Sequence, residues 1–591
     1  MARIAVVDRN KCNPVACGNY LCIRVCPVNK MGQECIVEGE YKKAKIIDEL
    51  CNGCGICPKK CPFDAIQIIN LPEKLTQHPI HRYGQNMFEL FSLPMVKPNT
   101  VVGIIGRNGI GKSTALQVLS GQVEPNLGNF KKPPLPQEVA LNYSTQWFGS
   151  YLKKLLTKEI KISYKPQRVE FLAEIYKGQK VRDLLKKVDE RGVVAGLIRE
   201  LDLEHLQERT VEELSGGELQ RLAIIAAAGK KADVYYFDEP TSFCDITHRI
   251  KVAKLIRRLA QGVSVIVVEH DLATLDYVSD EIQIVFGEPG AYCIFSQFKS
   301  VRRGINEYLD GYLPDDNMRF REYGIKFSEA PEEKQISKQI AVAYPGLKKD
   351  FGAFKLEVDA GNLHRGEVLT VMGSNGLGKS TFLKMLAGVL KPDNGEISKI
   401  AIAFKPQYLE SKIGGTVGEY LRKVSGAEFS SGWYKTNILE KLNIRTILNN
   451  EIKHLSGGEL QKVYIAATLS QQDVQIIAMD EPSAFIDVED RLKVAEVIKE
   501  FVSKKEICAI VVDHDIQFID YLGDSMLVFE GDPGKEGRVH APLRKREGMN
   551  KVLKNLDITY RRDKETFRPR MNKPGSQLDQ EQRSKGEYYY G

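Results

Sequence analysis

Short apolar runs followed directly by polar motifs recur in the same order in two stretches of the chain. The run TVVGII at 100–105 leads into the glycine-rich segment GRNGIGKS and then into the helical pattern TALQVLSG. The run VLTVM at 368–372 leads into GSNGLGKS in the same way. Later apolar runs end in Asp-Glu and in His-Asp in both stretches. Apolar runs of this length beside helical patterns are typical of buried parallel strands, so the pattern predicts two α/β units of one design.

Both glycine-rich segments match the P-loop motif in the strand-loop-helix context that the motif requires. Backbone N–H groups of such a loop cradle phosphates, its lysine reaches the β- and γ-phosphate oxygens, and its serine binds Mg²⁺. We therefore predict two ATP sites. Their P-loop residues are Gly106, Arg107, Asn108, Gly109, Ile110, Gly111, Lys112, Ser113 and Thr114, and Gly373, Ser374, Asn375, Gly376, Leu377, Gly378, Lys379, Ser380 and Thr381.

Each stretch continues with a glutamine after Lys-Pro, an LSGGE motif, a strand ending in Asp-Glu, and a His-Asp. This order of parts resembles the ATP-binding-cassette (ABC) ATPases. The resemblance implies that Glu239 and Glu481 are the general bases for the attacking water, and that His270 and His514 contact the γ-phosphate. It also implies two sets of magnesium ligands, Ser113, Gln167 and Asp238, and Ser380, Gln407 and Asp480.

The LSGGE motifs offer a second anion-binding helix N-terminus to each nucleotide. They comprise Ser215, Gly216, Gly217 and Glu218, and Ser456, Gly457, Gly458 and Glu459. We expect each motif to act on the ATP held by the other copy, so that Lys112 is paired with Ser456 and Lys379 with Ser215. ATP then joins the two lobes, and its hydrolysis releases them.

Nine of the twelve cysteines lie before residue 62. The group CNGCGICPKKCP has the spacing C-x₂-C-x₂-C-x₃-C-P, which holds iron–sulfur clusters in bacterial ferredoxins. In two-cluster ferredoxins the fourth cysteine of a run serves the other cluster. We therefore predict two [4Fe–4S] clusters in an α+β ferredoxin-like domain. One is held by Cys26, Cys51, Cys54 and Cys57, and the other by Cys12, Cys17, Cys22 and Cys61.

The first cysteine run is looser than the second, and Cys35 could replace one of its ligands, although a buried packing role fits a ninth cysteine better. Structural zinc is an alternative that the three closely spaced cysteines disfavour. The clusters either carry electrons or brace the fold. We favour bracing, because the sequence offers no flavin, quinone or thiol partner for electron flow.

The first cassette carries an insertion between its P-loop and its glutamine. Lys112 and Gln167 are 55 positions apart, whereas Lys379 and Gln407 are 28 apart. The extra residues fall near 129–162, where we predict two short helices around a glycine-serine turn, with a net charge of +4 and three interleaved aromatic residues, Trp147, Phe148 and Tyr151. A solvated excursion is possible, but basic and aromatic residues together favour docking to a phosphate backbone.

Aromatic and basic residues mark three further candidate features. The resemblance to cassette ATPases implies an adenine-stacking aromatic at about the distance at which Tyr83 precedes the first P-loop, and Tyr344 is the candidate in the second copy, although core aromatics are commoner. Residues 309–330 have few aliphatic side chains and suggest a hinge. From Arg538 to the end, 14 basic and 7 acidic residues give the tail a charge of +7, equal to that of the whole chain. For this tail, solvation and contact with a polyanion are equally plausible.

Composition supports a globular protein of several domains. The 591 residues suggest about four units at roughly 150 residues each, and 43% hydrophobic with 27% charged residues provides ample core. The sequence shows neither a run of about 18 uncharged apolar residues nor an apolar signal segment at its start. We therefore expect a cytoplasmic protein.

The cysteine head, the twin cassettes, the insertion and the strings HRYGQNMF, GYLPDDNMRFR and RPRMNKPGSQLDQEQRSKGEYYY together resemble ABC subfamily E, the RNase L inhibitor family of ribosome-recycling factors. The resemblance implies a monomeric ATPase that splits ribosomes into subunits beside a release factor or a Pelota-like rescue factor. It implies contacts with the small subunit and its RNA, and ATP-driven movement of the iron–sulfur domain.

The resemblance also divides the chain into five parts. They are an iron–sulfur domain (1–75), a first nucleotide-binding domain (76–308), a first hinge (309–330), a second nucleotide-binding domain (331–540) and a second hinge (541–591). The sequence departs from the family pattern in the four residues between Cys17 and Cys22, in Cys244 where leucine is usual, and in Lys462 where the first copy has Arg221. The alternative function is a soluble ABC ATPase in nucleic-acid repair or iron–sulfur redox sensing.

Overall fold

The computed structural model describes the chain except for residues 1–2, 8–10, 40–41, 48–49, 71–77, 322–323, 326, 328–338, 396, 398–399, 408, 410–412 and 590–591. It divides into two compact units. The first comprises Met1–Phe243, Val252–His270 and Val278–Gly324, and the second comprises Cys244–Lys251, Asp271–Tyr277 and Ile325–Gly591. The predicted boundary at 75 and residues 322–323, 326 and 328–330 of the predicted first hinge lie outside the described residues.

The amino-terminal head combines short strands with short helices. Strand β1 (Arg3–Val7) pairs antiparallel with β4 (Ile66–Asn70), and β2 (Ile36–Glu38) pairs with β3 (Ala44–Ile46). Helices α1 (Leu21–Val25), α2 (Pro27–Lys30) and α3 (Ile56–Lys60) cover a core in which cysteines pack with a few aliphatic side chains. The α+β prediction for this domain is confirmed.

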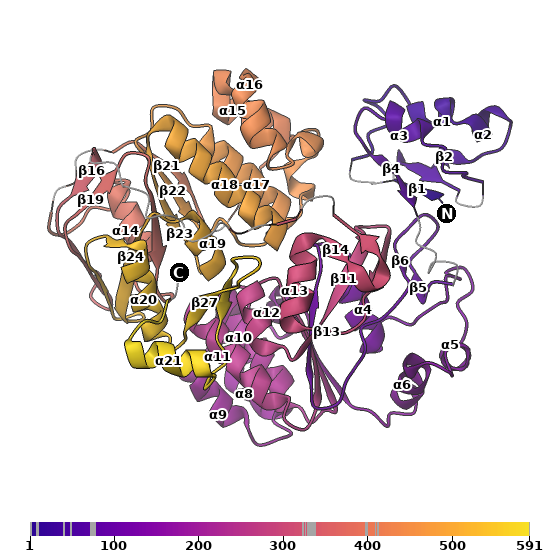
Figure 1. Cartoon of the computed structure of the whole chain (residues 1–591), viewed down its shortest axis with the longest axis horizontal. Helices are drawn as coiled ribbons and strands as arrows, with labels where there is room; N and C mark the ends of the chain where they lie inside the picture. The colour runs from indigo at the N-terminus through magenta and orange to yellow at the C-terminus, as the bar shows by residue number, and fades with distance from the viewer. Residues whose placement is uncertain are drawn as a thin grey trace. The chain divides into compact units, whose positions relative to one another are not determined.

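The first cassette is built on one sheet with the strand order β5-β6-β12-β11-β7-β10-β9-β8, and β13 pairs with β11. Figure 1 labels β5, β6, β11 and β13 of this sheet. The strands are β5 (His81–Arg82), β6 (Glu89–Leu90), β7 (Val101–Ile105), β8 (Ile162–Lys165), β9 (Val234–Asp238), β10 (Ser264–Val268), β11 (Glu281–Glu288), β12 (Tyr292–Phe295) and β13 (Lys299–Ser300). The helices are α4 (Lys112–Leu119), α5 (Pro136–Asn142), α6 (Trp147–Leu156), α7 (Glu170–Ile175), α8 (Val181–Val188), α9 (Val194–Glu200), α10 (Gly216–Gly229), α11 (Ile246–Leu259), α12 (Leu272–Val278) and α13 (Val301–Asp310), with 3₁₀ turns η3 (Glu204–Leu206) and η4 (Val211–Glu213).

The second cassette repeats this topology with the order β17-β18-β25-β24-β20-β23-β22-β21, and β26 pairs with β24. The strands are β16 (Ile340–Tyr344), β17 (Leu347–Asp350), β18 (Lys355–Val358), β19 (Gly361–His364), β20 (Val368–Met372), β21 (Ile402–Lys405), β22 (Ile476–Asp480), β23 (Cys508–Val512), β24 (Ser525–Asp532), β25 (Glu536–Val539) and β26 (Leu543–Arg544). The helical segments are α14 (Lys379–Leu386), α15 (Val417–Ser425), η6 (Gly426–Ser430), α16 (Gly432–Tyr434), η7 (Lys435–Glu440), η8 (Arg445–Ile447), η9 (Ile452–His454), α17 (Gly457–Leu469), α18 (Val488–Lys505) and α19 (Ile516–Leu522).

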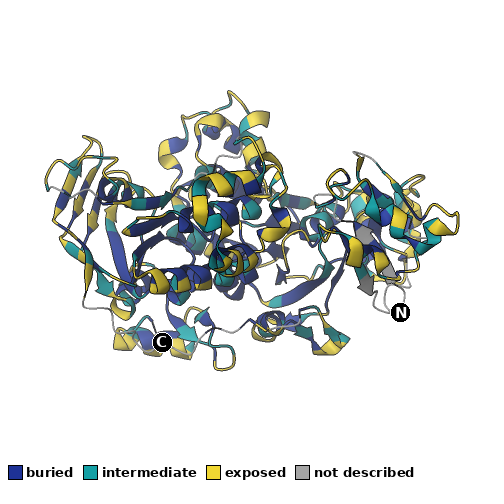
Figure 2. Cartoon of the chain, turned by 90° about the horizontal axis from the view of Figure 1, so that it is seen from above, coloured by how far each residue is buried: buried dark blue, intermediate teal, exposed yellow. Residues whose placement is uncertain are grey.

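The apolar runs of the sequence form the central parallel strands of both sheets. Every residue of β7, β9 and β10, and of β20, β22 and β23, is buried, and Figure 2 shows such strands in dark blue inside each cassette. A strand covered on both faces must be apolar throughout, which explains why these runs do not alternate. The prediction of tandem α/β cassettes is confirmed, and the sequence motifs lie at the carboxyl ends of these strands.

The beginning of the predicted first hinge is an ordered hairpin. Strands β14 (Tyr312–Leu313) and β15 (Met318–Arg319) pair across the 3₁₀ turn η5 (Pro314–Asp316). The fully buried Nζ of Lys299 lies 2.8 Å from Glu307 and 2.5 Å from Asp315, and Arg321 donates to the carbonyl of Leu309 at 2.7 Å. Ion pairs and a hydrogen bond from Arg321 therefore hold this segment, which has few aliphatic side chains.

The basic tail folds as part of the second unit. It contains α20 (Lys545–Asn555), β27 (Tyr560–Arg562), β28 (Pro569–Met571) and α21 (Gln577–Lys585). Arg562 donates to Asp520 at 2.9 Å, and Arg570 donates to Asp276 at 2.8 Å. For these arginines neither solvation nor a polyanion contact is correct, because buried carboxylates of the same unit neutralise them.

Candidate functional site

Both P-loops link a central strand to a helix that begins at the motif lysine. Nζ of Lys112 donates to the carbonyls of Gly106 and Arg107, both at 2.8 Å. Nζ of Lys379 donates to the carbonyls of Gly373 and Ser374 at 2.7 and 2.9 Å. The loop carbonyls thus hold each ammonium group at the head of its helix, where phosphate oxygens bind in P-loop proteins.

A close approach explains the glycine before the first lysine. Gly111 has φ +106°, and a Cβ at this position would lie 2.1 Å from Cζ of Phe88. Gly378 has φ +90°, and a Cβ there would lie 3.0 Å from Cζ of Phe354. A side chain at either position would both strain the backbone and displace an aromatic ring.

The Asp-Glu pairs end strands β9 and β22, beside the P-loop serines. Oγ of Ser380 donates to Asp480 at 2.8 Å, and Asp238 accepts from Ser113 in the same way. Serine hydroxyl and carboxylate oxygens are ligands that Mg²⁺ prefers, so these pairs fit the predicted ion positions.

Each predicted general base accepts a hydrogen bond from its cassette's glutamine. Nε2 of Gln167 lies 2.7 Å from Oε1 of Glu239, and Nε2 of Gln407 lies 2.8 Å from Oε1 of Glu481. The amide nitrogen therefore orients the carboxylate, and the amide oxygen is left for the predicted magnesium ligation. Both glutamates have φ +47°, a left-handed backbone conformation that is uncommon outside functional turns.

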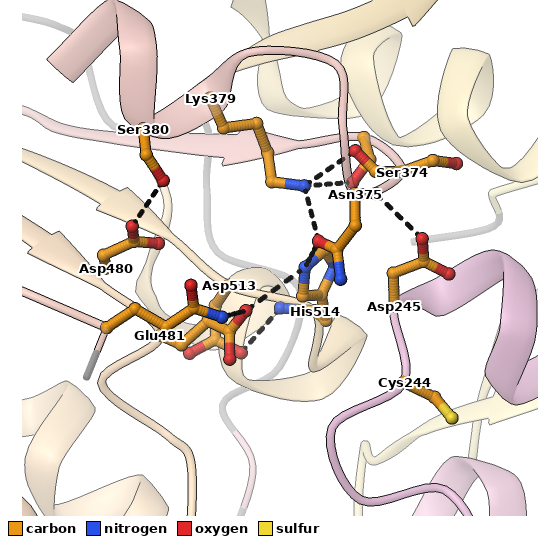
Figure 3. Close-up of polar contacts among 12 residues, drawn as sticks. Cys244, Asp245, Ser374, Asn375, Lys379, Ser380, Asp480, Glu481, Asp513 and His514 are labelled. Atoms are coloured by element: carbon orange, nitrogen blue, oxygen red, sulfur yellow. Dashed lines mark hydrogen bonds and ion pairs between the residues drawn. The ribbon is translucent and has the colours of Figure 1, made fainter. Parts of the chain in front are cut away.

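The switch histidines lie beside the same carboxylates. Nε2 of His270 is 3.5 Å from Oε1 of Glu239, and Nε2 of His514 is 3.5 Å from Oε1 of Glu481. In the second cassette Nε2 of His514 is also 3.1 Å from Oδ1 of Asn375 (Figure 3). P-loop, carboxylate and histidine therefore meet at one place in each cassette.

Burial tunes these groups toward proton transfer. Desolvation, with the charges of Asp513 and Asp480, raises the pKa of Glu481 to about 7. Burial and the neighbouring Asp238 likewise raise the pKa of Glu239. A carboxylate with a pKa near the working pH is well suited to accept a proton from water. Burial and the positive charge of Lys379 hold the pKa of His514 well below its ordinary value, so this imidazole is neutral.

Two residues that support the carboxylates were missed by the sequence analysis. The buried Nζ of Lys165 donates to the carbonyls of Asp238 and Glu239 at 2.9 and 3.1 Å, and Nε2 of Gln220 donates to Glu239 O at 2.6 Å. Lys405 and Gln461 repeat both contacts in the second cassette. The signal was present, because Lys-Pro-Gln and LSGGELQ occur in both copies.

Only one of the two predicted adenine-stacking tyrosines is exposed to solvent. Tyr83 is 45% exposed, and its hydroxyl lies 3.4 Å from Thr114 at the start of α4. Tyr344 is 2% exposed and packs edge-on against Phe382, with ring centroids 5.6 Å apart. The prediction for Tyr344 is wrong, because its ring is enclosed in the core.

Phe351 is the counterpart of Tyr83 in the second cassette. It follows β17 as Tyr83 follows β5, it precedes a glycine as Tyr83 does, and it is 49% exposed. Its ring stacks on Phe354, which lies against the P-loop glycine. The repeated aromatic-glycine pair was the sequence signal for this residue.

The LSGGE serines cap helices α10 and α17. Ser215 N and Oγ both contact Glu218, at 2.7 and 2.8 Å, and Ser456 Oγ lies 2.7 Å from Glu459. Both serines are exposed, so each capped helix N-terminus is accessible at the surface. A Cβ on Gly217 would lie 2.8 Å from a backbone oxygen, so the motif requires glycine there.

Four cysteines line a small cavity in the head domain. They are the four that the sequence analysis assigned to one cluster, Cys12, Cys17, Cys22 and Cys61. Burial raises the pKa of Cys22 to about 11 and also raises that of Cys12. Coordination to iron offsets the free energy needed to deprotonate these buried thiols. These residues fit an iron–sulfur cluster. The described residues contain no arrangement of three His, Cys, Asp or Glu side chains around a single-ion position, and a cluster spreads its thiolates around a larger core.

The remaining head cysteines gather in a second group. Burial is the main cause that raises the pKa of Cys57 to about 12, and the neighbouring thiols of Cys51, Cys54 and Cys26 add to this shift.

 The buried Cys35 thiol is within hydrogen-bond distance of Cys26 and Cys51. This group therefore holds five thiols for the four predicted ligand positions. Cys35 lies beside the predicted ligands, as expected for a packing residue, and its backbone carbonyl accepts the N–H of Ile47 at 2.7 Å.

Comparison with known proteins identifies the chain. The family described as "Possible Fer4-like domain in RNase L inhibitor" matches residues 2–34, and the family described as "ABC transporter" matches 94–242 and 357–484. The chain is 45% identical to translation initiation factor RLI1 of Saccharomyces cerevisiae, over 100% of this chain and 98% of that protein. It is 48% identical to an uncharacterised ABC transporter ATP-binding protein of Methanocaldococcus jannaschii, over 100% and 97% of the two chains. The chain belongs to the RNase L inhibitor family.

Solved structures of this family agree over the same length. A structure titled as ribosome-bound archaeal Pelota and ABCE1 matches with a TM-score of 0.93 and 50% identity, over 100% of this chain and 99% of that one. A complex of the archaeal ribosomal stalk protein aP1 with the recycling factor aABCE1 matches with a TM-score of 0.82 and 49% identity, over 88% and 100%. As a member of this family, the chain is an ABC ATPase that uses ATP and Mg²⁺ and carries iron–sulfur chemistry in its head.

The insertion that distinguishes the first cassette consists of the two predicted short helices, α5 and α6. The predicted glycine-serine turn is wrong, because Gly149 and Ser150 lie inside α6 and the chain turns at 143–146. A Cβ on Gly149 would lie 2.2 Å from the carbonyl oxygen of Tyr143, so this glycine lets the two helices meet.

The aromatic residues of the insertion anchor it rather than face solvent. Phe148 and Tyr151 are 2% and 6% exposed, and the Tyr151 hydroxyl lies 2.6 Å from that of Tyr236. The part of the docking hypothesis that used these rings is therefore wrong. The lysines at 131, 132, 153, 154, 158 and 161 are all exposed, so the surface of the insertion is basic.

None of the described helices is long and apolar enough to cross a membrane.

Proposed function

We propose that this protein is an ATP-dependent factor that splits ribosomes into subunits after termination or rescue. The observation that carries the proposal is the full-length match to a ribosome-bound member of the family, with a TM-score of 0.93 over 100% of this chain. The partners are the ribosome, chiefly its small subunit and ribosomal RNA, and a release factor or a Pelota-like rescue factor. The exposed lysines of the insertion, in α6 and in the segments that flank the two helices, supply a basic surface for the RNA backbone.

The two ATP sites provide the driving reaction. Lys112 and Lys379 hold the phosphate oxygens, and the serine and aspartate of each cassette hold Mg²⁺, which neutralises phosphate charge when bound. Glu239 and Glu481 accept the proton of the attacking water, and the glutamine that donates to each carboxylate fixes its direction. The pairing of each P-loop with the LSGGE motif of the other copy remains a prediction from motif order.

We propose two [4Fe–4S] clusters in the head, one in the cavity of Cys12, Cys17, Cys22 and Cys61, and one held by Cys26, Cys51, Cys54 and Cys57. The five-part division at 75, 308, 330 and 540 also remains a proposal. In this division the head is the part that ATP-driven closure moves.

Sedimentation of purified ribosomes tests the function. Ribosomes are incubated with the protein and ATP, with a non-hydrolysable analogue, or with ADP, and subunits are separated on sucrose gradients. We expect free subunits with ATP and intact ribosomes with ADP. The analogue shows whether binding alone suffices or turnover is needed.

The matched control is the protein with both Glu239→Gln and Glu481→Gln. Removing a positioned general base lowers turnover by about 10²- to 10⁴-fold while ATP binding is retained. Normal ATP turnover in this double variant would contradict the assignment of the bases. Ribosomes that stay intact with the wild-type protein, ATP and the appropriate release factor would contradict the splitting function.

A further inference from the structure

A loop from the first cassette lies against the second P-loop. Residues Cys244–Lys251 follow the Asp-Glu pair of the first cassette but belong to the second compact unit. Oδ2 of Asp245 accepts the backbone N–H of Asn375 at 2.8 Å (Figure 3). The hydroxyls of Thr247 and Ser374 are 2.9 Å apart. The loop therefore holds the P-loop at two consecutive residues.

His248 holds the carboxylate that makes the first of these contacts. Nδ1 of His248 lies 2.7 Å from Oδ1 of Asp245, and the backbone N–H of His248 donates to the same oxygen at 2.9 Å. Burial by itself raises the pKa of Asp245, but the His248 bond and the nearby positive charges outweigh it and hold that pKa below its ordinary range. An ionised carboxylate only accepts hydrogen bonds, so Nδ1 carries the proton.

Asn375, the P-loop residue held by Asp245, contacts His514 and Lys379 through its side chain. Oδ1 of Asn375 is 3.1 Å from Nε2 of His514 and 3.3 Å from Nζ of Lys379. His514 in turn is 3.5 Å from Oε1 of Glu481. A continuous set of polar contacts therefore runs from His248 through Asp245 and Asn375 to the second catalytic centre.

The corresponding loop of the second cassette is built differently. The sequence CDITHR at 244–249 corresponds to IDVEDR at 486–491, so Asp490 replaces His248. Asp487 accepts from the backbone N–H of Asp490 at 3.0 Å, and Asp490 pairs with Lys462 at 2.7 Å. The Asp490 pair also accounts for Lys462, which follows LSGGELQ in the second cassette. The first cassette has Arg221 at that position, and its residue three positions after the loop aspartate is not acidic.

We propose that His248 is a positioning residue for the second ATP site. Its imidazole fixes Asp245, which holds the backbone N–H of Asn375 and so places the Asn375 side chain beside Lys379 and His514. The inference rests on the ATPase reaction of the proposed function but not on ribosome splitting. Because ATP hydrolysis is measured without ribosomes, failure of the splitting assay leaves it intact.

The test separates the two sites with the base variants. ATP turnover by the second site is measured in a Glu239→Gln background, and turnover by the first site in a Glu481→Gln background. His248→Ala removes the imidazole, whereas His248→Asn places an amide N–H near the position of Nδ1. His205→Ala, at an exposed histidine of η3, is the matched control.

We expect His248→Ala to lower kcat/KM of the second site about tenfold, the scale for losing one hydrogen bond to a charged group. His248→Asn should restore most of this loss, and the first site should be unchanged. Equal losses at both sites, or a loss that asparagine does not restore, would overturn the proposal in favour of a general role in folding the loop. An unchanged second site with His248→Ala would also overturn it. Thermal unfolding of each variant establishes that the proteins compared are folded.

Discussion

Arg568 is fully buried, and its guanidinium donates to the carboxylate of Asp276 at 3.1 Å. The two residues are 292 positions apart, and Asp276 lies in α12, six positions after His270. Asp520 lies six positions after His514 and is bound by Arg562 and by the hydroxyl of Tyr589. The tail thus neutralises the carboxylate that follows each switch histidine.

Replacing Arg568 should destabilise the second unit. Arg568→Ala leaves Asp276 with Arg570 as its remaining charged partner, and breaking a buried pair costs about 3 kcal/mol. The measurement is urea unfolding followed by tryptophan fluorescence. Arg546→Ala is the control, because Arg546 is largely exposed and its pair with Glu587 contributes little. Equal stability of the two variants would contradict the structural role of the buried arginine.

The second ATP site should depend on pH through Glu481. Its pKa is raised to about 7, so it is protonated and unable to accept a proton at lower pH. In the Glu239→Gln background we expect kcat/KM to rise from about pH 6 to about pH 8 and then level off, because this ratio reports groups of the free enzyme. A flat profile across this range would exclude Glu481 as the titrating base.

Phe351 should contribute to ATP affinity in the second cassette. Stacking on a base is worth about 1–3 kcal/mol, so Phe351→Ala should raise the dissociation constant of that site about tenfold. Tyr344→Phe should leave it unchanged, because the buried Tyr344 hydroxyl has no hydrogen-bond partner among the described residues. Titration of fluorescent ATP analogues measures both variants. An unchanged dissociation constant in Phe351→Ala would exclude Phe351 as the stacking residue.

Cys22 and Cys35 should differ in their effect on iron. Two [4Fe–4S] clusters correspond to about eight iron atoms per chain. Cys22→Ala removes a ligand that lines the cavity, so we expect about four iron atoms after anaerobic purification. Cys35→Ala should retain about eight, because the four ligands of the second group remain. Iron loss in the Cys35 variant would make it a ligand instead.

The lysines of α6 and of the turn that follows it should strengthen ribosome binding electrostatically. Changing Lys153, Lys154 and Lys158 to glutamine removes phosphate contacts, so affinity should fall most at low salt and the salt dependence should become shallower. The matched control changes three exposed lysines elsewhere in the cassette, Lys177, Lys186 and Lys187. Filter binding over a range of KCl concentrations measures both. An equal loss in the control would indicate a general charge effect.

Local motifs were predictable from the sequence because their chemistry resides in neighbouring residues. A P-loop needs its glycines, lysine and serine within eight positions, and C-x₂-C-x₂-C brings three thiolates together on one turn of chain. The buried parallel strands were equally evident, since burial on both faces demands uninterrupted apolar residues.

Only the tertiary structure decided which aromatic rings were free and which charges were paired. Tyr344 and Tyr151 carry no local mark of burial, and each is enclosed by side chains from other elements. Asp245 and Asn375 are 130 positions apart, so no spacing rule connects them. Contacts of this kind depend on how separate elements pack, and no local pattern in the sequence shows which distant elements meet.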